Sequence, residues 1–130
     1  MRLEHIGIVV KSIEARKDFW GNILGLKFVE SKEVSPQKVR VAVFDAGGVK
    51  IELIEPMSKD SPISKFLEKR GEGIHHLCFE VENIEKAISL YKTHGLAPIG
   101  ELPYKGAFAK KVIFLHPKTT HGILIELCEK

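Results

Sequence analysis

Two histidines and two glutamates stand at matching places in two similar halves of this sequence of 130 residues. An offset of 71 residues aligns His5 with His76, together with much of the sequence around them. Each half also closes on a similar apolar pattern with one glutamate at its centre, Glu52 in the first and Glu126 in the second. Such repetition indicates two copies of one structural unit. Imidazole and carboxylate suit Zn, Ni, Co, Mn or Fe(II), so these four side chains predict one shared divalent metal ion.

Each of the four candidate ligands has a simpler explanation when it is taken alone. Glu52 and Glu126 lie in aliphatic segments, where an isolated carboxylate is costly unless it is paired or bound to a cation. If their strands lay at a sheet edge, both carboxylates would instead face water. His5 alone would more often be an ordinary core or surface histidine. The repeat equivalence of all four residues is what favours the metal site.

The two cysteines offer a second kind of donor. Cys78 follows His76 by two residues, and Cys128 follows Glu126 by two residues. Thiolate ligation is an alternative, but two residues along a strand span about 7 Å, which favours buried packing. Their positions show no disulfide spacing, so we expect free thiols in a reducing cytoplasm. His75 points to the opposite strand face from His76 and is expected to be structural.

The elements that must position these residues follow from apolar periodicity and from capping and turn residues. Each half predicts a strand, a helix and three further strands, which is a βαβββ module. Expected strands cover residues 3–10, 26–34, 39–46 and 49–56 in the first module and 73–81, 96–102, 109–116 and 122–128 in the second. Expected helices begin after Ser12 and Asn83, and a short linker helix covers 61–71. We expect Ile13, Phe19, Trp20, Ile23 and Leu24 on the buried side of the first helix, and Ile84, Ala87, Ile88 and Tyr91 on that of the second.

Bulk composition narrows the class of protein. Hydrophobic content of 44% and charged content of 28% are ordinary for a globular domain of this size, and the chain is long enough for a real core. A net charge of +3 is too small to argue for nucleic acid. The start of the chain is charged and no apolar run approaches 18 residues, so we expect a cytoplasmic protein without a membrane span. The whole chain is expected to form one domain, with modules at 1–56 and 73–130 joined by the linker at 57–72.

At the level of whole motifs, the sequence resembles the vicinal oxygen chelate superfamily, which includes glyoxalase I and extradiol dioxygenases. Within it, the sequence is most similar to the methylmalonyl-CoA epimerases, through three segments: 61–67, 73–76 and 113–127, the last of which contains the His-Pro-Lys turn at 116–118. This resemblance implies an α+β fold in which two βαβββ modules form a curved, eight-stranded mixed sheet around a metal site, with the helices outside. It also implies a homodimer and an acyl-CoA substrate.

The resemblance implies an isomerase. The expected reaction is metal-dependent epimerisation of methylmalonyl-CoA by proton abstraction at carbon 2, through a metal-stabilised enolate. Glu126 is the first choice as catalytic base and Glu52 the second, while His5, Glu52, His76 and Glu126 hold one divalent metal ion, which could be Co, Mn, Ni or Zn. The alternatives are a glyoxalase I-like lyase acting on a glutathione hemithioacetal, and a ligand-binding member of the superfamily without turnover.

The sequence departs from the epimerases at one point. Some of these enzymes carry a further catalytic glutamate in the strand after a Pro-Glu-Gln-Gly loop. Here the corresponding loop is Pro36-Gln37-Lys38, and the strand from Val39 to Phe44 contains no carboxylate. The second base must therefore come from elsewhere in the chain.

Overall fold

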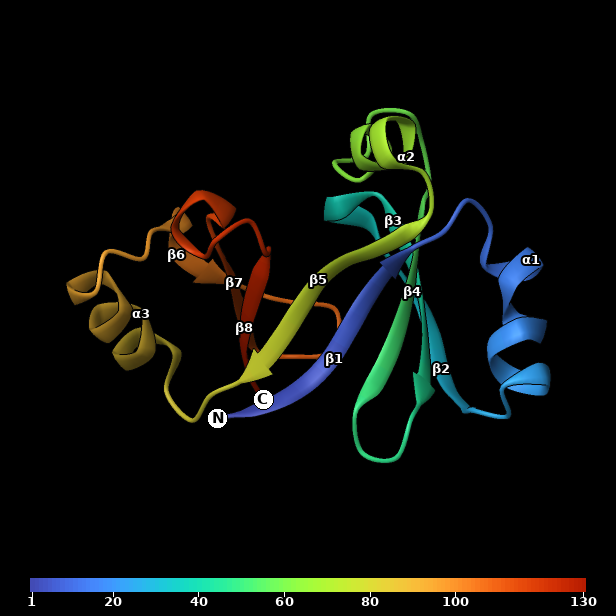
Figure 1. Ribbon diagram of the computed structural model, residues 1–130, viewed down its shortest axis with the longest axis horizontal. Coiled ribbons are helices and arrows are strands. Elements are labelled where there is room, and N and C mark those ends of the chain that lie inside the picture. The colour runs from blue at the N-terminus through green and yellow to red at the C-terminus, as the bar shows by residue number, and fades with distance from the viewer. The chain divides into compact units, whose positions relative to one another are not determined.

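The computed structural model describes every residue from 1 to 130 and divides into two compact units. One unit comprises residues 5–75, and the other comprises residues 1–4 together with 76–130. The strands are β1 (Arg2–Val9), β2 (Lys27–Val34), β3 (Val39–Asp45), β4 (Lys50–Pro56), β5 (Gly73–Glu80), β6 (Pro98–Tyr104), β7 (Lys111–Leu115) and β8 (Ile125–Glu129) (Figure 1). The helical segments are α1 (Ile13–Asp18), η1 (Phe19–Ile23), η2 (Ser35–Gln37), α2 (Ser64–Arg70), α3 (Ile84–Thr93) and η3 (Pro117–Thr119).

Within the unit of residues 5–75, the strands follow the order β2-β3-β4-β1. β1 runs parallel to β4, whereas β3 is antiparallel to both of its neighbours. A two-residue turn joins β3 to β4, and its residues Gly47 and Gly48 have φ angles of 84° and 103°. Positive φ at both positions is what a tight hairpin of this kind requires, which explains the two adjacent glycines.

The second unit repeats the arrangement. Its strands follow the order β5-β8-β7-β6, with β5 parallel to β8 and the other pairs antiparallel. Its helix α3 packs on one sheet face through Ile84, Ala87, Ile88 and Tyr91, as expected. The predicted fold class, two βαβββ modules with eight strands of mixed direction, is confirmed. None of the helices has the length and apolar character that a membrane crossing requires.

The core beneath α3 yields a stability prediction. Ile113 of β7 has no exposed surface and packs among Ile84, Leu115 and Leu127. Ile113→Ala removes buried methyl and methylene groups and leaves a cavity, so we expect it to lower the free energy of unfolding by about 2–5 kcal/mol.

Urea denaturation followed by circular dichroism measures this loss. Leu90→Ala is the matched control, because Leu90 lies on α3 with 56% of its surface exposed and should stay within about 0.5 kcal/mol of wild type. Equal midpoints for the two variants would contradict the assignment of Ile113 to the core.

The first helix differs from expectation in its last turn. Residues 19–23 form a π-helix, in which the Leu24 N–H donates to the Phe19 carbonyl at 2.8 Å. A π turn takes more residues than an α turn, so the apolar stripe drifts off the sheet. Ile13 and Trp20 pack on the core as predicted, but Phe19, Ile23 and Leu24 are 44%, 69% and 52% exposed. The prediction that these three are buried is wrong.

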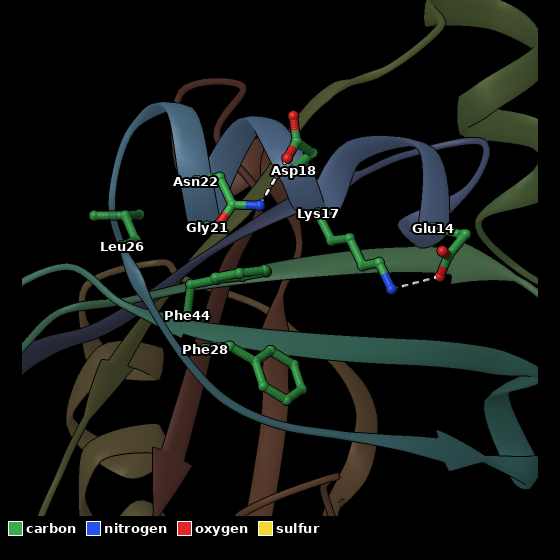
Figure 2. A pocket seen from close by; sticks show the side chains of 8 residues that line it. All are labelled: Glu14, Lys17, Asp18, Gly21, Asn22, Leu26, Phe28 and Phe44. Atoms are coloured by element: carbon green, nitrogen blue, oxygen red, sulfur yellow. Dashed lines mark hydrogen bonds and ion pairs between the residues drawn. The ribbon is translucent and has the colours of Figure 1, made fainter.

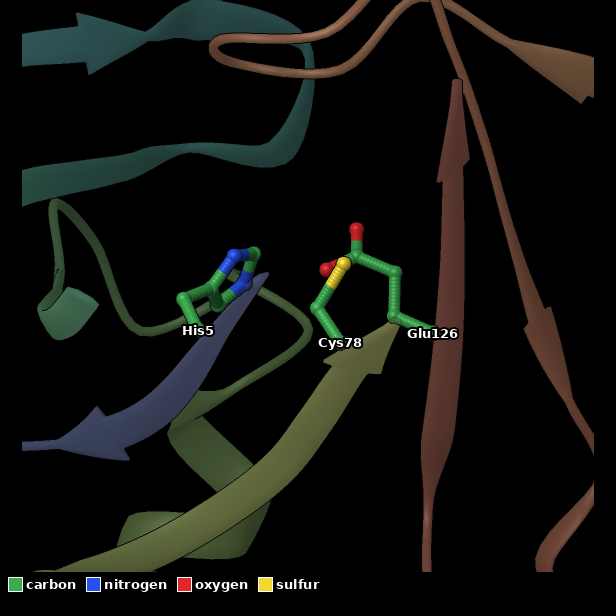
Figure 3. A group of neighbouring side chains, drawn as sticks. All are labelled: His5, Cys78 and Glu126. Carbon is green, nitrogen blue, oxygen red and sulfur yellow. The ribbon is translucent and has the colours of Figure 1, made fainter. Parts of the chain in front are cut away.

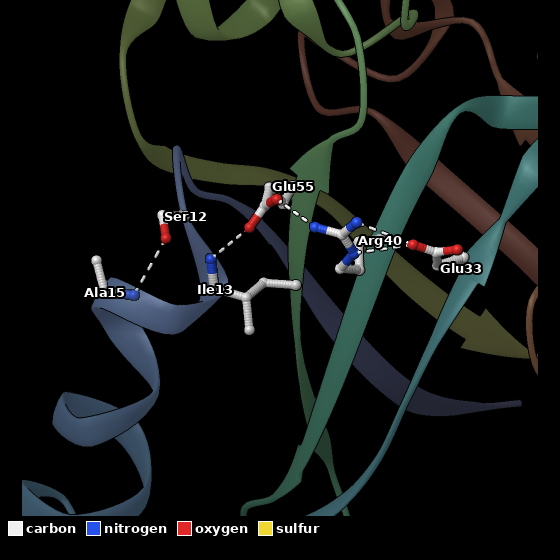
Figure 4. Close-up of polar contacts among 6 residues, drawn as sticks. All are labelled: Ser12, Ile13, Ala15, Glu33, Arg40 and Glu55. Atoms are coloured by element: carbon white, nitrogen blue, oxygen red, sulfur yellow. Dashed lines mark hydrogen bonds and ion pairs between the residues drawn. The ribbon is translucent and has the colours of Figure 1, made fainter.

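The N-terminus of α1 is fixed to the sheet by a chain of polar contacts (Figure 4). Ser12 caps the helix, since its hydroxyl accepts from the Ala15 N–H at 3.2 Å. The Glu55 carboxylate accepts from the Ile13 N–H at 2.7 Å and from the Arg40 guanidinium at 2.9 Å. A negative charge at a helix N-terminus is stabilising. α1 is therefore held by a charged contact with β4 as well as by its apolar side.

Several other boundaries differ from the expected ones for local reasons. The linker helix begins at Ser64 rather than near Ser61, because the Ser61 hydroxyl bonds the Gln37 carbonyl instead of capping. β6 begins at Pro98, since the Ala97 N–H is taken by the Thr119 hydroxyl. β8 begins only at Ile125, after a turn in which the Gly122 N–H donates to the Pro117 carbonyl.

Candidate functional site

One His–Glu pair lies within the unit of residues 5–75. His5 on β1 and Glu52 on β4 are neighbours on parallel strands, with 3.1 Å between Nδ1 of His5 and Oε2 of Glu52. Both residues are buried. They occupy the sheet face opposite to α1, because Ile51 and Leu53, on either side of Glu52, pack with the helix side. The water-facing alternative for Glu52 is excluded.

A second pair occupies the same place in the other unit. Nε2 of His76 on β5 lies 3.3 Å from Oε1 of Glu126 on β8, and both residues are buried. Phe114 of β7 is the cross-strand partner of Glu126, and its ring stands edge-on to the His76 ring, with centroids 5.3 Å apart. The aromatic contact restricts the imidazole, so this pair is held by packing as well as by its own polar contact.

Both pairs have the donor chemistry and the spacing of ligands that share a cation. Two ligand atoms that are each about 2.1 Å from one ion lie about 3.0 Å apart at a right angle and about 3.4 Å apart at a tetrahedral angle. The observed separations of 3.1 and 3.3 Å fall inside this range. Nitrogen and carboxylate oxygen donors suit Zn, Co, Mn or Ni. The residues within each pair therefore fit a divalent ion, and the sharing of one ion by both pairs stays a prediction.

The two pairs differ in the residue that lies directly opposite the glutamate. In the first unit the strand register sets Gly7 against Glu52, and in the second it sets Cys78 against Glu126. Figure 3 shows the Cys78 thiol beside the Glu126 carboxylate, and these two groups lie within 4.8 Å of each other. The sequence interpretation favoured Cys78 as packing only. The parallel register, which alternation along a strand does not reveal, makes it a possible third donor as well.

Both cysteines are buried in the second unit. Cys78 and Cys128 are 0% and 2% exposed and pack around Val112. The hydrogen bond with Cys128, burial, and the nearby charge of Glu126 all raise the pKa of Cys78 well above its usual range. Both cysteines are free, as expected.

We expect neither thiol to react with Ellman's reagent in the folded protein, because the reagent needs an accessible thiolate. In urea above the unfolding transition, both should react, and absorbance at 412 nm counts them. Rapid reaction of one thiol under native conditions would contradict the burial of this strand pair.

On the inner face of β3, the residues beside Glu52 are apolar, and the carboxylate of Asp45 at the strand end accepts from the Gly48 N–H at 2.8 Å. Val43 lies directly opposite Glu52, and Val41 lies on the same face; both are buried and apolar. Arg40 points to the other face, where it binds Glu33 and Glu55. Glu52 is thus the carboxylate in contact with His5 on this face, and its catalytic role stays a prediction.

A cavity of about 580 Å³ in the unit of residues 5–75 lies on the helix side of the sheet instead (Figure 2). Phe28 and Phe44 form its aromatic floor, and their rings meet edge to face at 5.6 Å. Lys17 and Glu14 at its rim pair with each other at 2.8 Å. The cavity therefore lies on the sheet face opposite to His5 and Glu52.

His75 has the structural role that its strand face suggested. Its ring lies edge-on to Phe66 of α2, with centroids 5.0 Å apart, and Arg70 lies 5.7 Å from the Phe66 ring on the same helix. These contacts fasten α2 to β5 within the unit of residues 5–75. His75 therefore takes no part in the His–Glu pairs.

Comparison with known proteins places this geometry in a family. Over residues 4–114 the chain matches the model of the glyoxalase/bleomycin resistance protein/dioxygenase superfamily. It is 45% identical to the uncharacterised protein YqjC of Bacillus subtilis, covering 98% of this chain and 91% of that one. It is 40% identical to human mitochondrial methylmalonyl-CoA epimerase, covering 97% of this chain and 72% of that one.

A solved structure shows the same likeness. Streptomyces coelicolor methylmalonyl-CoA epimerase in complex with 2-nitronate-propionyl-CoA superimposes with a TM-score of 0.92 at 29% identity, over 100% of this chain and 97% of that one. The match thus extends over both modules and agrees with the resemblance drawn from the motifs. The chain belongs to the glyoxalase/bleomycin resistance protein/dioxygenase superfamily, and the relatives it resembles include methylmalonyl-CoA epimerases.

Proposed function

We propose that this protein is an enzyme that interconverts the two epimers of methylmalonyl-CoA by moving the proton at carbon 2. The buried His–Glu pair that recurs in both modules carries the proposal, because ionisable pairs kept in an apolar sheet interior are costly to maintain without a role. The likeness to curated epimerases at 35–40% identity supports the choice of substrate. The substrate would be a small acyl-CoA.

His5, Glu52, His76 and Glu126 are proposed to hold one divalent metal ion. The ion would supply Lewis-acid stabilisation of the negative charge that develops on the substrate oxygens. Its identity among Co, Mn, Ni and Zn is left open by the donor set. The proposal treats residues 1–130 as one domain, with module one at 1–56, the linker at 57–72 and module two at 73–130, acting as a cytoplasmic homodimer.

The chain's own carboxylates move the proton. Glu126 takes the proton from carbon 2, which leaves an enolate on the substrate, and a second carboxyl group on the other face, in its protonated form, returns a proton and becomes ionised. Glu52 is the candidate for this second role, because Val43 opposite it and Val41 on the same face of β3 carry no ionisable group. The apolar neighbours Phe114 and Val43 exclude water from the two carboxylates and so strengthen their interaction with the substrate.

Solvent exchange tests the proposal. Purified protein is loaded with each candidate metal and incubated with methylmalonyl-CoA in deuterated buffer. We expect the carbon-2 proton to be replaced by deuterium, as loss of its NMR signal, at a rate that follows metal content. Absence of exchange, together with isomerisation of the glutathione hemithioacetal of methylglyoxal, would overturn the proposal in favour of a glyoxalase I-like lyase. Absence of both reactions despite tight acyl-CoA binding would indicate a binding protein.

A further inference from the structure

Tyr104, which the sequence interpretation did not single out, lies on the same sheet face as Glu126. The register pairs Tyr104 on β6 with Val112 on β7, and Val112 with Cys128 on β8. The adjacent row pairs Phe114 with Glu126. Directly paired residues on antiparallel strands point to the same face. Tyr104 on β6 is therefore separated from Glu126, the proposed base on β8, by one strand, and it lies in the neighbouring row of side chains on the same face.

The end of β6, next to Tyr104, is irregular. Between the pairs Ile99–Phe114 and Tyr104–Val112, four residues of β6 oppose a single residue of β7, so the strand bulges. Bulges re-aim side chains and are common beside active sites. The following turn then folds tightly over Val112: a Cβ atom on Gly106 would lie 2.6 Å from Cγ1 of Val112. Tyr104 stands at the mouth of this turn with 40% of its surface exposed, so a ligand can reach it.

The phenol is a hydrogen-bond donor at neutral pH. Burial raises the pKa of Tyr104 above its ordinary value. The strand register, with Tyr104 in the row next to that of Glu126, places the phenol on the same sheet face as the carboxylate. A neutral phenol near the carboxylate base can donate a hydrogen bond to an oxygen of a ligand that binds next to them.

We propose that Tyr104 contacts the substrate and donates a hydrogen bond to the acyl oxygen on which negative charge develops when carbon 2 loses its proton. This inference rests on the proposed function and adds a residue to it. A donor aimed at developing charge stabilises the enolate more than the neutral thioester, because hydrogen bonds to charged acceptors are the stronger ones. No proton is transferred from the phenol, so Glu126 and its partner keep their roles.

The test compares two ligands on two variants. 2-Nitronate-propionyl-CoA, the ligand in the solved relative, carries negative charge beside the acyl group, whereas propionyl-CoA is neutral there. Tyr104→Phe should weaken nitronate binding about ten- to a hundred-fold and change propionyl-CoA binding less than about threefold. Calorimetric titration of metal-loaded protein measures both dissociation constants.

Tyr91→Phe is the matched control, because Tyr91 is the only other tyrosine and packs on the α3 side, with its hydroxyl near Met1 Sδ at 3.8 Å. It should leave both affinities unchanged. An equal loss for both ligands in Tyr104→Phe would mean a merely structural role and overturn the inference, as would unchanged nitronate binding. If the wild-type protein binds neither ligand, the proposed function is wrong and the inference is wrong with it. If the wild-type protein binds both ligands, the result for Tyr104→Phe tests the inference alone.

Discussion

Replacing Glu126 by glutamine is expected to slow deuterium exchange at carbon 2 by about a hundred- to ten-thousand-fold, the usual cost of losing a positioned base. An amide keeps the size of the side chain and an oxygen that can face the metal, but it cannot accept the proton. Proton NMR of methylmalonyl-CoA in deuterated buffer measures the rate. Metal content must be determined on the same samples, because weaker metal binding would also slow exchange.

Glu129→Gln is the control on the same strand. Glu129 lies on the opposite face of β8 from Glu126 and pairs with Lys111 at 3.6 Å. Its removal should leave the exchange rate within about twofold of wild type, since it breaks only a surface ion pair. A Glu126→Gln protein that retains its metal and exchanges at the wild-type rate would show that another residue is the base.

The second large effect concerns the metal itself. His76→Ala should weaken metal binding by more than the ten- to a hundred-fold that outer-shell partners typically contribute, because it removes a ligand atom. His5→Ala should do the same from the other module if both pairs serve one ion. Competition with a chromophoric chelator, read as absorbance, gives the dissociation constants.

His75→Ala is the control for His76→Ala, because the two histidines are adjacent in the sequence. The neighbouring histidine contacts Phe66 on the other strand face, so its loss should leave metal affinity unchanged while slightly lowering stability. Two independent ions, one for each His–Glu pair, would contradict the shared site: the stoichiometry would then be two per chain, and each His→Ala variant would keep one of them.

The repeat made much of the fold accessible from sequence. Alternating aliphatic residues defined the strands around Glu52 and Glu126, and the matching start and end of each half showed that the modules have the same order of elements. Alternation placed each glutamate on one strand face but left a water-facing position open; the repeat equivalence favoured an inner site, and both glutamates are buried. Alternation along a strand and repeated motifs can be recognised in a single sequence, because they involve only residues close together in the chain or copies of the same pattern.

What the sequence missed depends on contacts between distant segments. Strand register is set by neighbours, so the pairing of Cys78 with Glu126 and of Tyr104 with Val112 carried no local signal. The π turn at 19–23 was hidden because an ordinary helical pattern continues through Phe19, Ile23 and Leu24. The late start of α2 reflects the Ser61 hydroxyl, which donates a hydrogen bond to the Gln37 carbonyl far away in the sequence instead of capping the helix.

The difference between Gly7 and Cys78 bears on how a duplicated module diverges. Both copies keep the same His and Glu, yet beside the glutamate one carries no side chain and the other carries a thiol. Such a difference leaves the ligand set unchanged while altering the volume and polarisability next to each carboxylate. Each copy can then drift at this position without loss of the shared pair. The likeness of the two modules can therefore be broken one neighbour at a time, while the His and the Glu of each pair are kept.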